Sequence, residues 1–305
     1  MNNNLQNWIE DFEFEKEQIH KNLTFIPITS SKRYDFDFLT LKRAFEEELA
    51  EVKELDNGGS VPEVRVINRS DKYLIIFDGE HLIGAKQNRI VNKTIIINPL
   101  SEIVIPVSCT EEGRWHNVSE EFTKSDYNAP SSVRRASKKK GHSQSEVWEN
   151  VASVMHFMNF DSPTSSLNEV FEEVAPKLGG YKRKVKPLPS QIGLMAFING
   201  RFLGLDIIGD PSVFTDLYDS LINSYILDAM GESDQDIVEF NSEYLRSLVL
   251  DEVAKSKLTR GKKIGAEKRE EIKGAETVGE FVSFTQKPIH LAIFADSDVT
   301  DTRVN

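Results

Sequence analysis

The chain has 305 residues, enough for one large domain or two ordinary ones, and 39% hydrophobic with 28% charged residues is ordinary for a soluble globular protein. Its formal net charge of -12 argues against general binding to nucleic acids or anionic membranes, because both require an excess of lysine and arginine. An anionic ligand would therefore have to meet a local group of basic side chains.

The N-terminal sequence and the cysteine count predict a cytoplasmic protein. The single cysteine, Cys109, excludes an intramolecular disulfide, and residues 1–18 are polar and acidic where a secretory signal would be basic and then apolar. No apolar run approaches the roughly 20 residues that cross a bilayer, so no membrane contact is expected.

Residues 1–21 are predicted to form an amphipathic helix. Leu5, Trp8, Ile9 and Phe12 follow the i, i+3, i+4, i+7 spacing of one helical face. That face would pack on the body of the protein, on a protein partner or on a second copy of the chain.

Residues 22–119 are predicted to form a strand-rich body. Asp78-Gly79 is a strong type I′ hairpin signal between the apolar runs 73–77 and 81–85. Residues 90–98 and 102–108 are expected to form a second strand pair across a turn at 99–101. Short strands at this spacing favour a sandwich or a partly closed barrel.

Residues 120–142 are poor in apolar side chains and rich in basic ones, which predicts a mobile loop and the main internal boundary. The basic residues are solvated there, or they form a lid over an anionic ligand. This basic loop contains Arg134, Arg135, Lys138, Lys139 and Lys140.

Residues 143–258 are predicted to form a helical layer with a central β-hairpin, and residues 259–305 to return as strands to the body. Asn199-Gly200 repeats the hairpin signal of Asp78-Gly79, and a last hairpin is expected near Phe281 to Phe294. The fold class is thus α+β, an antiparallel β-sandwich-like body with an inserted helical layer, in a single unit of residues 1–305.

Polar groups interrupt the strand-like runs between Gly79 and Trp115, and such groups indicate a pocket. Glu80 is a candidate general base or acceptor for ligand hydroxyls, or else an exposed turn carboxylate. Arg89 and Arg114 are the preferred phosphate contacts, supported by the amides of Gln87, Asn88 and Asn92, which could equally satisfy buried backbone groups.

Cys109 and Trp115 have plainer interpretations. Cys109 ends an apolar strand beside the acidic pair Glu111 and Glu112, which disfavours a nucleophilic thiolate and predicts a packing role. Trp115 could stack on a base or cap the core. The chain has no zinc-ligand spacing, EF-hand or phosphate loop, so neither a metal nor a cofactor is expected.

The motifs GEHLIGAKQNR and IPVSCTEEGRW resemble the signature of the ARG-and-rhodanese-phosphatase-superfamily-associated protein domain family. The likeness continues through NLTFIPI, SQSEVW, QIGLMAFING and the closing VGEFVSFTQKPIHLAIF. It implies a link to ADP-ribose and other NAD-derived metabolites. Glu267, Arg269 and His290 lie in segments that resemble the closing motifs of the family, which implies that they return to the same pocket.

Three functions remain open on the sequence. In an enzyme, such as a hydrolase or transferase, Glu80, Glu111 or His290 would act on a ribosyl centre while Arg89 and Arg114 hold a phosphate-bearing, nucleotide-like small molecule. In a sensor, the same pocket would bind that ligand without turnover. The alternative is a non-catalytic structural or protein-interaction module that uses the N-terminal helix.

Overall fold

The computed structural model describes residues 3–34, 36–55, 62–138, 144–233 and 242–296. Its largest sheet has the strand order β1-β3-β13-β14-β18-β17-β16-β15, with β2 paired to β3. These strands are β1 (Phe12–Phe14), β2 (Gln18–His20), β3 (Leu23–Ser30), β13 (Gln191–Ile198), β14 (Arg201–Ile208), β15 (Lys257–Arg260), β16 (Lys268–Lys273), β17 (Thr277–Phe284) and β18 (Lys287–Ala295).

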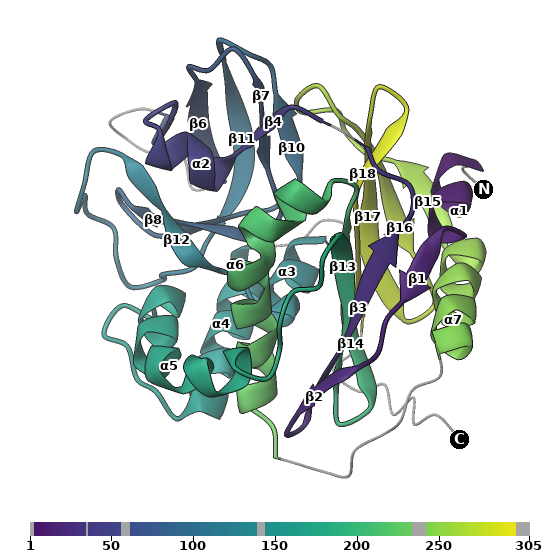
Figure 1. The fold of residues 1–305 in the computed structure, drawn as a ribbon. Helices are drawn as coiled ribbons and strands as arrows, with labels where there is room; N and C mark the ends of the chain where they lie inside the picture. The colour runs from purple at the N-terminus through teal and green to yellow at the C-terminus, as the bar shows by residue number, and fades with distance from the viewer. Residues whose placement is uncertain (1–2, 35, 56–61, 139–143, 234–241, 297–305) are drawn as a thin grey trace.

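Two smaller sheets form a sandwich beside the large one (Figure 1). One has the order β10-β7-β4 and the other β12-β8-β9-β11-β6-β5. Apolar side chains from both sheets share one buried cluster, as expected for face-to-face packing. The strands are β4 (Phe38–Thr40), β5 (Ala50–Lys53), β6 (Glu63–Asn68), β7 (Tyr73–Ile76), β8 (Glu80–Gly84), β9 (Arg89–Val91), β10 (Ile95–Ile97), β11 (Ser101–Cys109) and β12 (Phe122–Asn128).

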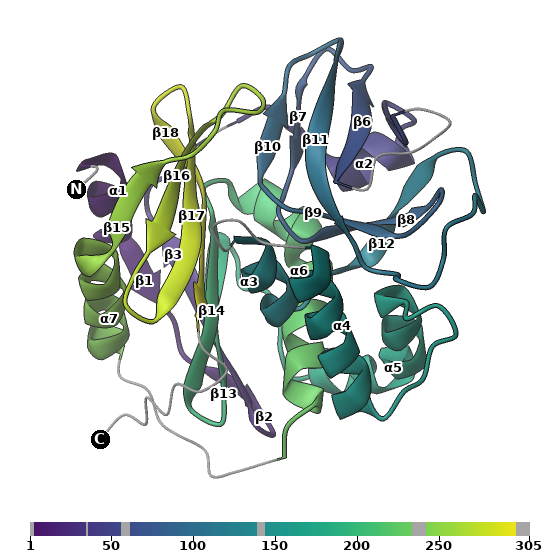
Figure 2. The ribbon, with the colours of Figure 1, turned by 180° about the vertical axis from the view of Figure 1, so that it is seen from behind.

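The helices lie in three places: one short helix lies on the sandwich, the first and last helices lie on one face of the large sheet, and the helices of the inserted layer lie on its other face, next to the sandwich (Figures 1 and 2). The predicted α+β fold class, with a sandwich-like body, is confirmed. The helices are α1 (Asn3–Ile9), α2 (Leu41–Glu46), α3 (Ser131–Lys138), α4 (Gln144–Met158), α5 (Leu167–Lys182), α6 (Pro211–Met230) and α7 (Ser242–Lys255). None of the helices in the described ranges is both long and apolar enough to cross a membrane.

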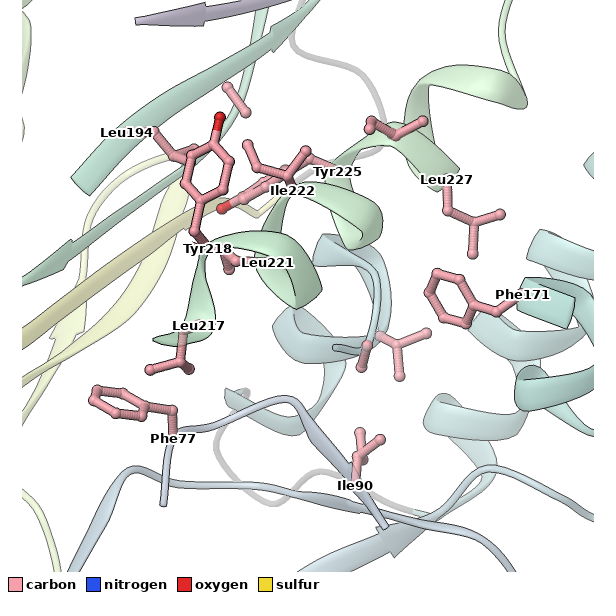
Figure 3. Packing of buried hydrophobic residues seen from close by; sticks show 14 of the residues in the cluster. Phe77, Ile90, Phe171, Leu194, Leu217, Tyr218, Leu221, Ile222, Tyr225 and Leu227 are labelled. Carbon is pink, nitrogen blue, oxygen red and sulfur yellow. The ribbon is translucent and has the colours of Figure 1, made fainter. Parts of the chain in front are cut away.

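Helix α6 lies at the centre of the main hydrophobic core. Asp210 caps its first turn by accepting from the backbone N–H of Ser212, and Pro211 at its start needs no donor there. Side chains such as Leu217 and Tyr225 pack between Leu194 of the large sheet and Phe77 of the sandwich (Figure 3). This packing fixes the helical layer against both sheet systems.

The two Gly-containing turn signals have different outcomes. Asn199 and Gly200 have φ angles of 51° and 77°, as a type I′ turn requires, and they join the paired strands β13 and β14. The hairpin predicted at Asp78-Gly79 is wrong, because β7 and β8 belong to different sheets. Gly79 has a φ of 82°, and a Cβ atom there would lie 2.6 Å from Cδ of Arg134. Position 79 therefore has to be glycine, because the side chain of Arg134 passes close to its backbone between β7 and β8.

The predicted strand 90–98 is divided between two sheets. β9 pairs with β11 as expected, whereas β10 pairs with β7 of the other sheet. The break at 92–94 forms a corner, in which Thr94 is fully buried. Periodicity alone does not reveal such a change of sheet, because both halves are apolar.

The basic loop predicted at 120–142 is wrong where the structure describes it. Residues 122–128 form β12 and residues 131–138 form α3, while 139–142 lie outside the described residues. Arg134, Arg135 and Lys138 are buried rather than solvated. The carboxylate partners of Arg134 and Lys138 come from distant segments of the chain, and local composition does not reveal such partners.

The N-terminal helix is shorter than predicted. α1 ends at Ile9, and Asp11 accepts hydrogen bonds from Ser30, Ser31 and the backbone N–H of Lys32, which draw the chain into β1 beside β3. The apolar stripe is nevertheless real, since its side chains are fully buried against the large sheet. Those side chains are Leu5, Trp8, Ile9 and Phe12.

Truncation of Trp8 to alanine tests whether α1 is part of the core. The indole ring lies 5.2 Å from that of Phe12 and 6.2 Å from that of Phe281. We expect Trp8→Ala to lower the free energy of unfolding by about 3–5 kcal/mol, the usual cost of such a cavity. Urea unfolding measures this, and a loss below about 1 kcal/mol would show that α1 is only loosely attached.

Candidate functional site

The sequence-predicted residues near Arg114 come together as one buried polar cluster. Arg114 contacts a carboxylate oxygen of Glu111 at 2.5 Å and donates to Oδ1 of Asn88 at 3.1 Å. It also donates to the backbone carbonyls of Ala85 and His116. The second oxygen of Glu111 accepts from Thr164 at 2.8 Å. Arg114 therefore closes the loop that follows β8, and its guanidinium is occupied within the chain.

Arg89 has a similar structural environment. It is fully buried, donates to the amide oxygen of Gln87 at 2.9 Å and contacts the thiol of Cys109. Gln144 at the start of α4 bonds to both the N–H and the carbonyl of Cys109, each at 2.8 Å, and so joins the helical layer to β11. Binding of phosphate by Arg89 and Arg114 stays a prediction, but the contacts of both side chains are internal.

Cys109 is buried, as its predicted packing role requires. Burial raises the pKa of its thiol to about 11, despite the nearby charge of Arg89. The acidic neighbours of Cys109 predict a raised thiol pKa, but in the structure desolvation is the larger cause of the rise. A thiol of this kind is protonated near neutral pH.

Glu80 is buried and sits inside the corner between β7 and β8. Its Oε2 atom accepts from the backbone N–H of Phe77 at 2.7 Å, and the Lys124 ammonium lies 3.7 Å from Oε1. Burial raises the pKa of Glu80 above its ordinary value. The exposed-turn interpretation is wrong, since the carboxylate holds the corner backbone from within.

Trp115 and Asn92 lie at opposite extremes of exposure. Trp115 is 48% exposed, with the charged ends of Lys86 and Arg89 at 5.4 and 5.8 Å from its ring. The indole ring therefore covers the side chain of Arg89 and is not part of the apolar core of the sandwich. Asn92 is buried, and its Oδ1 atom has no hydrogen-bond partner among the described residues.

Glu267, Arg269 and His290 do not join the clusters around Arg89 and Arg114. Glu267 accepts from the backbone N–H of Ile96 at 3.0 Å, and Arg269 donates to the carbonyl of Thr94. Nε of Arg269 lies 3.2 Å from Glu280, and Nδ1 of His290 lies 2.8 Å from the Thr94 hydroxyl. The closing motifs therefore fasten β10 to the large sheet.

These residues border a larger group of buried charges, here named the central charge network. Arg134 forms two hydrogen bonds with Asp206, at 2.9 and 2.6 Å, and a third with Asp78 at 3.1 Å. Lys138 places its ammonium 3.0 Å from Asp78 and 2.7 Å from Glu280. The network consists of Asp78, Arg134, Lys138, Asp206, Glu280 and His290.

The network carboxylates are held ionised by their partners. Burial alone would favour the protonated acids, but the charges of Arg134 and Lys138 outweigh it and keep the pKa of Asp78 far below its ordinary value. Asp206 and Glu280 have pKa values of about 2 for the same reason, chiefly through Arg134 and Lys138 respectively. The network therefore holds three ionised carboxylates inside the protein, beside the charges of Arg134 and Lys138.

Asp78, Glu280 and His290 come close enough to one another to share a metal ion, with one ligand atom of each within 4.8 Å of the others. The Lys138 ammonium already contacts two of these three side chains. The protein thus supplies a cation of its own at this position, and this amine balances the two carboxylates.

Sequence reasoning did not find most of the network. Asp206 and Glu280 are single charges inside the apolar strands FLGLDII and VGEFVSF, and a lone carboxylate in a buried strand requires a partner. Arg134 and Lys138 lie four residues apart, so they share one helical face. The lone carboxylates in apolar strands and the basic pair on one helical face were the two sequence patterns that could have indicated a buried charge network.

A cavity of about 320 Å³ lies beside the network, between α3, α4, the end of α6 and the β13–β14 hairpin. Its polar lining includes Ser131 and Arg135 of α3, Arg201 of β14 and Asp228 of α6. Its apolar lining includes Phe294, whose ring separates the cavity from Arg134, 4.6 Å away on the network side. Of these residues only Arg135 was considered from the sequence, as part of the basic loop that could form a lid over an anionic ligand.

Two lining side chains have contacts suited to a ligand site. Asp228 accepts from the backbone N–H of Ser131 at 2.9 Å, and burial raises its pKa to about 6, which is close to neutral pH. Arg201 contacts both carboxylate oxygens of Glu232 at 2.5 Å through its Nη2 atom. Within the described ranges, the Nε and Nη1 atoms of Arg201 have no protein partner. The cavity thus offers both acceptors and donors.

Replacing Arg114 tests whether its cluster is structural. We expect Arg114→Met to lower the free energy of unfolding by about 3–5 kcal/mol, because Glu111 would remain as an unpaired buried charge. Arg69→Gln is the matched control, since it breaks an exposed pair with Glu51 and should cost at most about 1 kcal/mol. Urea denaturation compares the two, and equal small losses would refute the structural role.

The pH dependence of stability offers a test of two buried groups with opposite signs. Burial lowers the pKa of His81 to about 3, so from pH 6.5 downward only the unfolded chain gains this proton and stability falls by about 1.4 kcal/mol per pH unit. The raised pKa of Asp228 acts in the opposite direction, because between about pH 6 and the ordinary value of 3.8 the folded protein holds the extra proton.

The variants His81→Gln and Asp228→Asn separate these contributions. Relative to wild type, we expect His81→Gln to become less destabilised between pH 7 and pH 4.5, and Asp228→Asn to become more destabilised. Urea unfolding at both pH values measures the differences. Parallel pH profiles for all three proteins would contradict the pKa shifts.

The comparisons with known proteins bear on the whole chain. No curated protein and no solved structure compared with the chain gives a match. A family model described as the ARG and Rhodanese-Phosphatase-superfamily-associated Protein domain matches residues 11–294. This match extends across all three sheets and includes helices α2 to α7. The resemblance predicted from the sequence motifs is confirmed, and the chain belongs to the family of the ARG and Rhodanese-Phosphatase-superfamily-associated Protein domain.

Proposed function

We propose that the protein binds a phosphate-bearing, nucleotide-like metabolite in the cavity beside α3, with an ADP-ribose-like or other NAD-derived compound as the expected class. The observation that supports it is the cavity itself, which combines an apolar surface with Arg135, Arg201 and Asp228. A concave apolar site with a few convergent polar groups and a shifted pKa is the usual form of a small-molecule site.

Each part of a nucleotide has a matching surface in this cavity. The ring of Phe202 offers an apolar face for a base. Asp228 and Asn150 offer acceptors and donors for ribose hydroxyls. Arg201 offers a guanidinium for a phosphate. A volume of about 320 Å³ is at the small end of the ligand-site range, and so suits one nucleoside phosphate unit.

This proposal moves the phosphate contacts from Arg89 and Arg114 to Arg135 and Arg201. The first two arginines are bonded to side chains and carbonyls of their own chain. Arg201 lies at the surface of the cavity with two nitrogen atoms unused in the described structure. In an acidic protein, an anion gains binding energy from such a cation only at short range.

The interaction-module alternative loses its main support. It depended on an apolar helix face available to a partner, but the stripe of α1 packs inside the same chain. The large apolar side chains that are exposed in the described part of the chain are Leu100, Val104, Trp115, Val118 and Phe157, and none of them lies on α1. A small-molecule site is therefore the better account.

A ligand panel tests the proposal. We expect AMP and ADP-ribose to raise the melting temperature, with a stabilisation of about 2.7 kcal/mol at 100 times the dissociation constant. Arg201→Gln should weaken binding by about 1.5–3 kcal/mol, or roughly tenfold or more, because it removes a charge-assisted contact. Calorimetry measures the affinity, and chromatography of the ligand after incubation distinguishes turnover from binding alone.

Arg69→Gln is the matched control, because it removes the same charge from another exposed Arg–Glu pair. It should leave the affinity unchanged. If no nucleotide of the panel shifts the wild-type melting curve at millimolar concentration, the proposal fails. Equal weakening in both variants would indicate a general charge effect rather than a site at Arg201.

A further inference from the structure

A second cavity, of about 540 Å³, is lined by residues of the turn after β2 and of the C-terminal ends of α5 and α6. These elements meet at the lower end of the molecule in Figure 1. Its lining includes His20, Lys21, Lys177, Tyr181 and Glu232. The rings of His20 and Tyr181 meet edge to face at 4.6 Å, and the Lys21 ammonium lies 5.4 Å from the centre of the Tyr181 ring. The wall of the cavity is thus partly aromatic and fixed by ring contacts.

The charge of this cavity contrasts with that of the whole chain. Lys21 and Lys177 both line it, and neither forms an ion pair in the part of the chain that the structure describes. Glu232 is the carboxylate in the lining, and both of its oxygens are already bonded to Arg201. In a chain with a net charge of -12, two ammonium groups without carboxylate partners at one concavity favour an anion.

Gly180 keeps the floor of the cavity open. It lies inside α5, and a Cβ atom added there would meet nothing within 4 Å. Its φ is not in the left-handed region, so neither the backbone nor crowding requires glycine. Glycine in a helix costs stability relative to alanine, so packing gives no reason for it at this position. The need to leave space for a ligand does give a reason for glycine at position 180.

The two cavities share a wall at Glu232. This residue is held by Arg201, which lines the first cavity, and by the side-chain amide of Asn199 in the hairpin turn. A ligand whose first phosphate binds Arg201 would therefore extend into the second cavity alongside Glu232, whose position is fixed by Arg201 and Asn199.

We propose that the second cavity is an anion subsite, in which Lys21 and Lys177 bind a second phosphoryl group of an extended nucleotide. The inference rests on the proposed function, and it narrows the ligand class from nucleoside monophosphates to nucleotides that carry a second phosphate, as in a nucleoside diphosphate ester. The monophosphate binds the first cavity alone, and the extended ligand spans both.

The test compares AMP with ADP-ribose as probes by calorimetry. Wild type should bind ADP-ribose more tightly than AMP. The double variant Lys21→Gln/Lys177→Gln should bind ADP-ribose about tenfold or more weakly and leave the AMP affinity unchanged, because each lysine supplies a charge-assisted contact only to the second phosphate. The matched control is Lys287→Gln/Lys255→Gln, which changes the net charge equally and includes Lys287, another lysine over an aromatic ring.

Gly180→Leu gives an independent test by filling the cavity. It should weaken ADP-ribose binding and spare AMP binding, and the melting temperature without ligand should not fall, because the added side chain replaces a glycine inside a helix. Gly180→Ala should raise that melting temperature and serves as the folding control.

The outcomes distinguish this inference from the proposed function. If neither probe binds, both fail. If AMP binds but ADP-ribose binds no more tightly, or if the Lys21/Lys177 variant binds ADP-ribose as the lysine control does, the subsite is wrong while the first cavity stands. A loss of ADP-ribose affinity confined to the Lys21/Lys177 and Gly180→Leu variants supports the subsite.

Discussion

The pairing of Arg134 with Asp78 and Asp206 is the interaction on which the arrangement of the molecule depends. Asp78 lies at the corner between two sandwich strands, Arg134 on α3, and Asp206 on the large sheet, so one guanidinium joins three parts of the fold. Such a set of buried charges is tolerated only when every partner is present, since an unpaired charge in the interior costs several kcal/mol. The charges therefore specify one arrangement of sandwich, helices and sheet.

This constraint also accounts for local features that are otherwise unexplained. The glycine at position 79 is needed because the Arg134 side chain passes where a Cβ atom would stand. Tyr225 of α6 donates its hydroxyl to Asp206 at 2.5 Å, so the central helix is tied to the same carboxylate. Along α3, Arg134 and Lys138 enter the network while Ser131 and Arg135 line the first cavity. The cavity wall is thus positioned by the charges behind it.

Local patterns predicted the elements better than their assembly. The Asn199-Gly200 turn followed from local chemistry, because both residues tolerate the positive φ that the hairpin requires. The same signal failed at Asp78-Gly79, where a tertiary contact with Arg134 decides the backbone path. The basic segment at 131–138 failed for the same reason, since its partners are 56 and 72 residues away in the chain. Periodicity and composition cannot report contacts at that distance.

For the candidate site, too, the sequence indicates unusual residues but does not indicate which distant residues they contact. The motif residues Arg89 and Arg114 stand out in the sequence as basic side chains close to apolar runs, and both are buried with polar partners. Their contacts in the structure are with other residues of the same chain, while binding of phosphate by either side chain stays a prediction. Arg201, Lys21 and Lys177 do not stand out in the sequence, and the carboxylate that holds Arg201, Glu232, is 31 residues away in the chain. Under the proposed function, the anion would meet the nitrogen atoms of Arg201 that Glu232 leaves unbonded and the ammonium groups of Lys21 and Lys177.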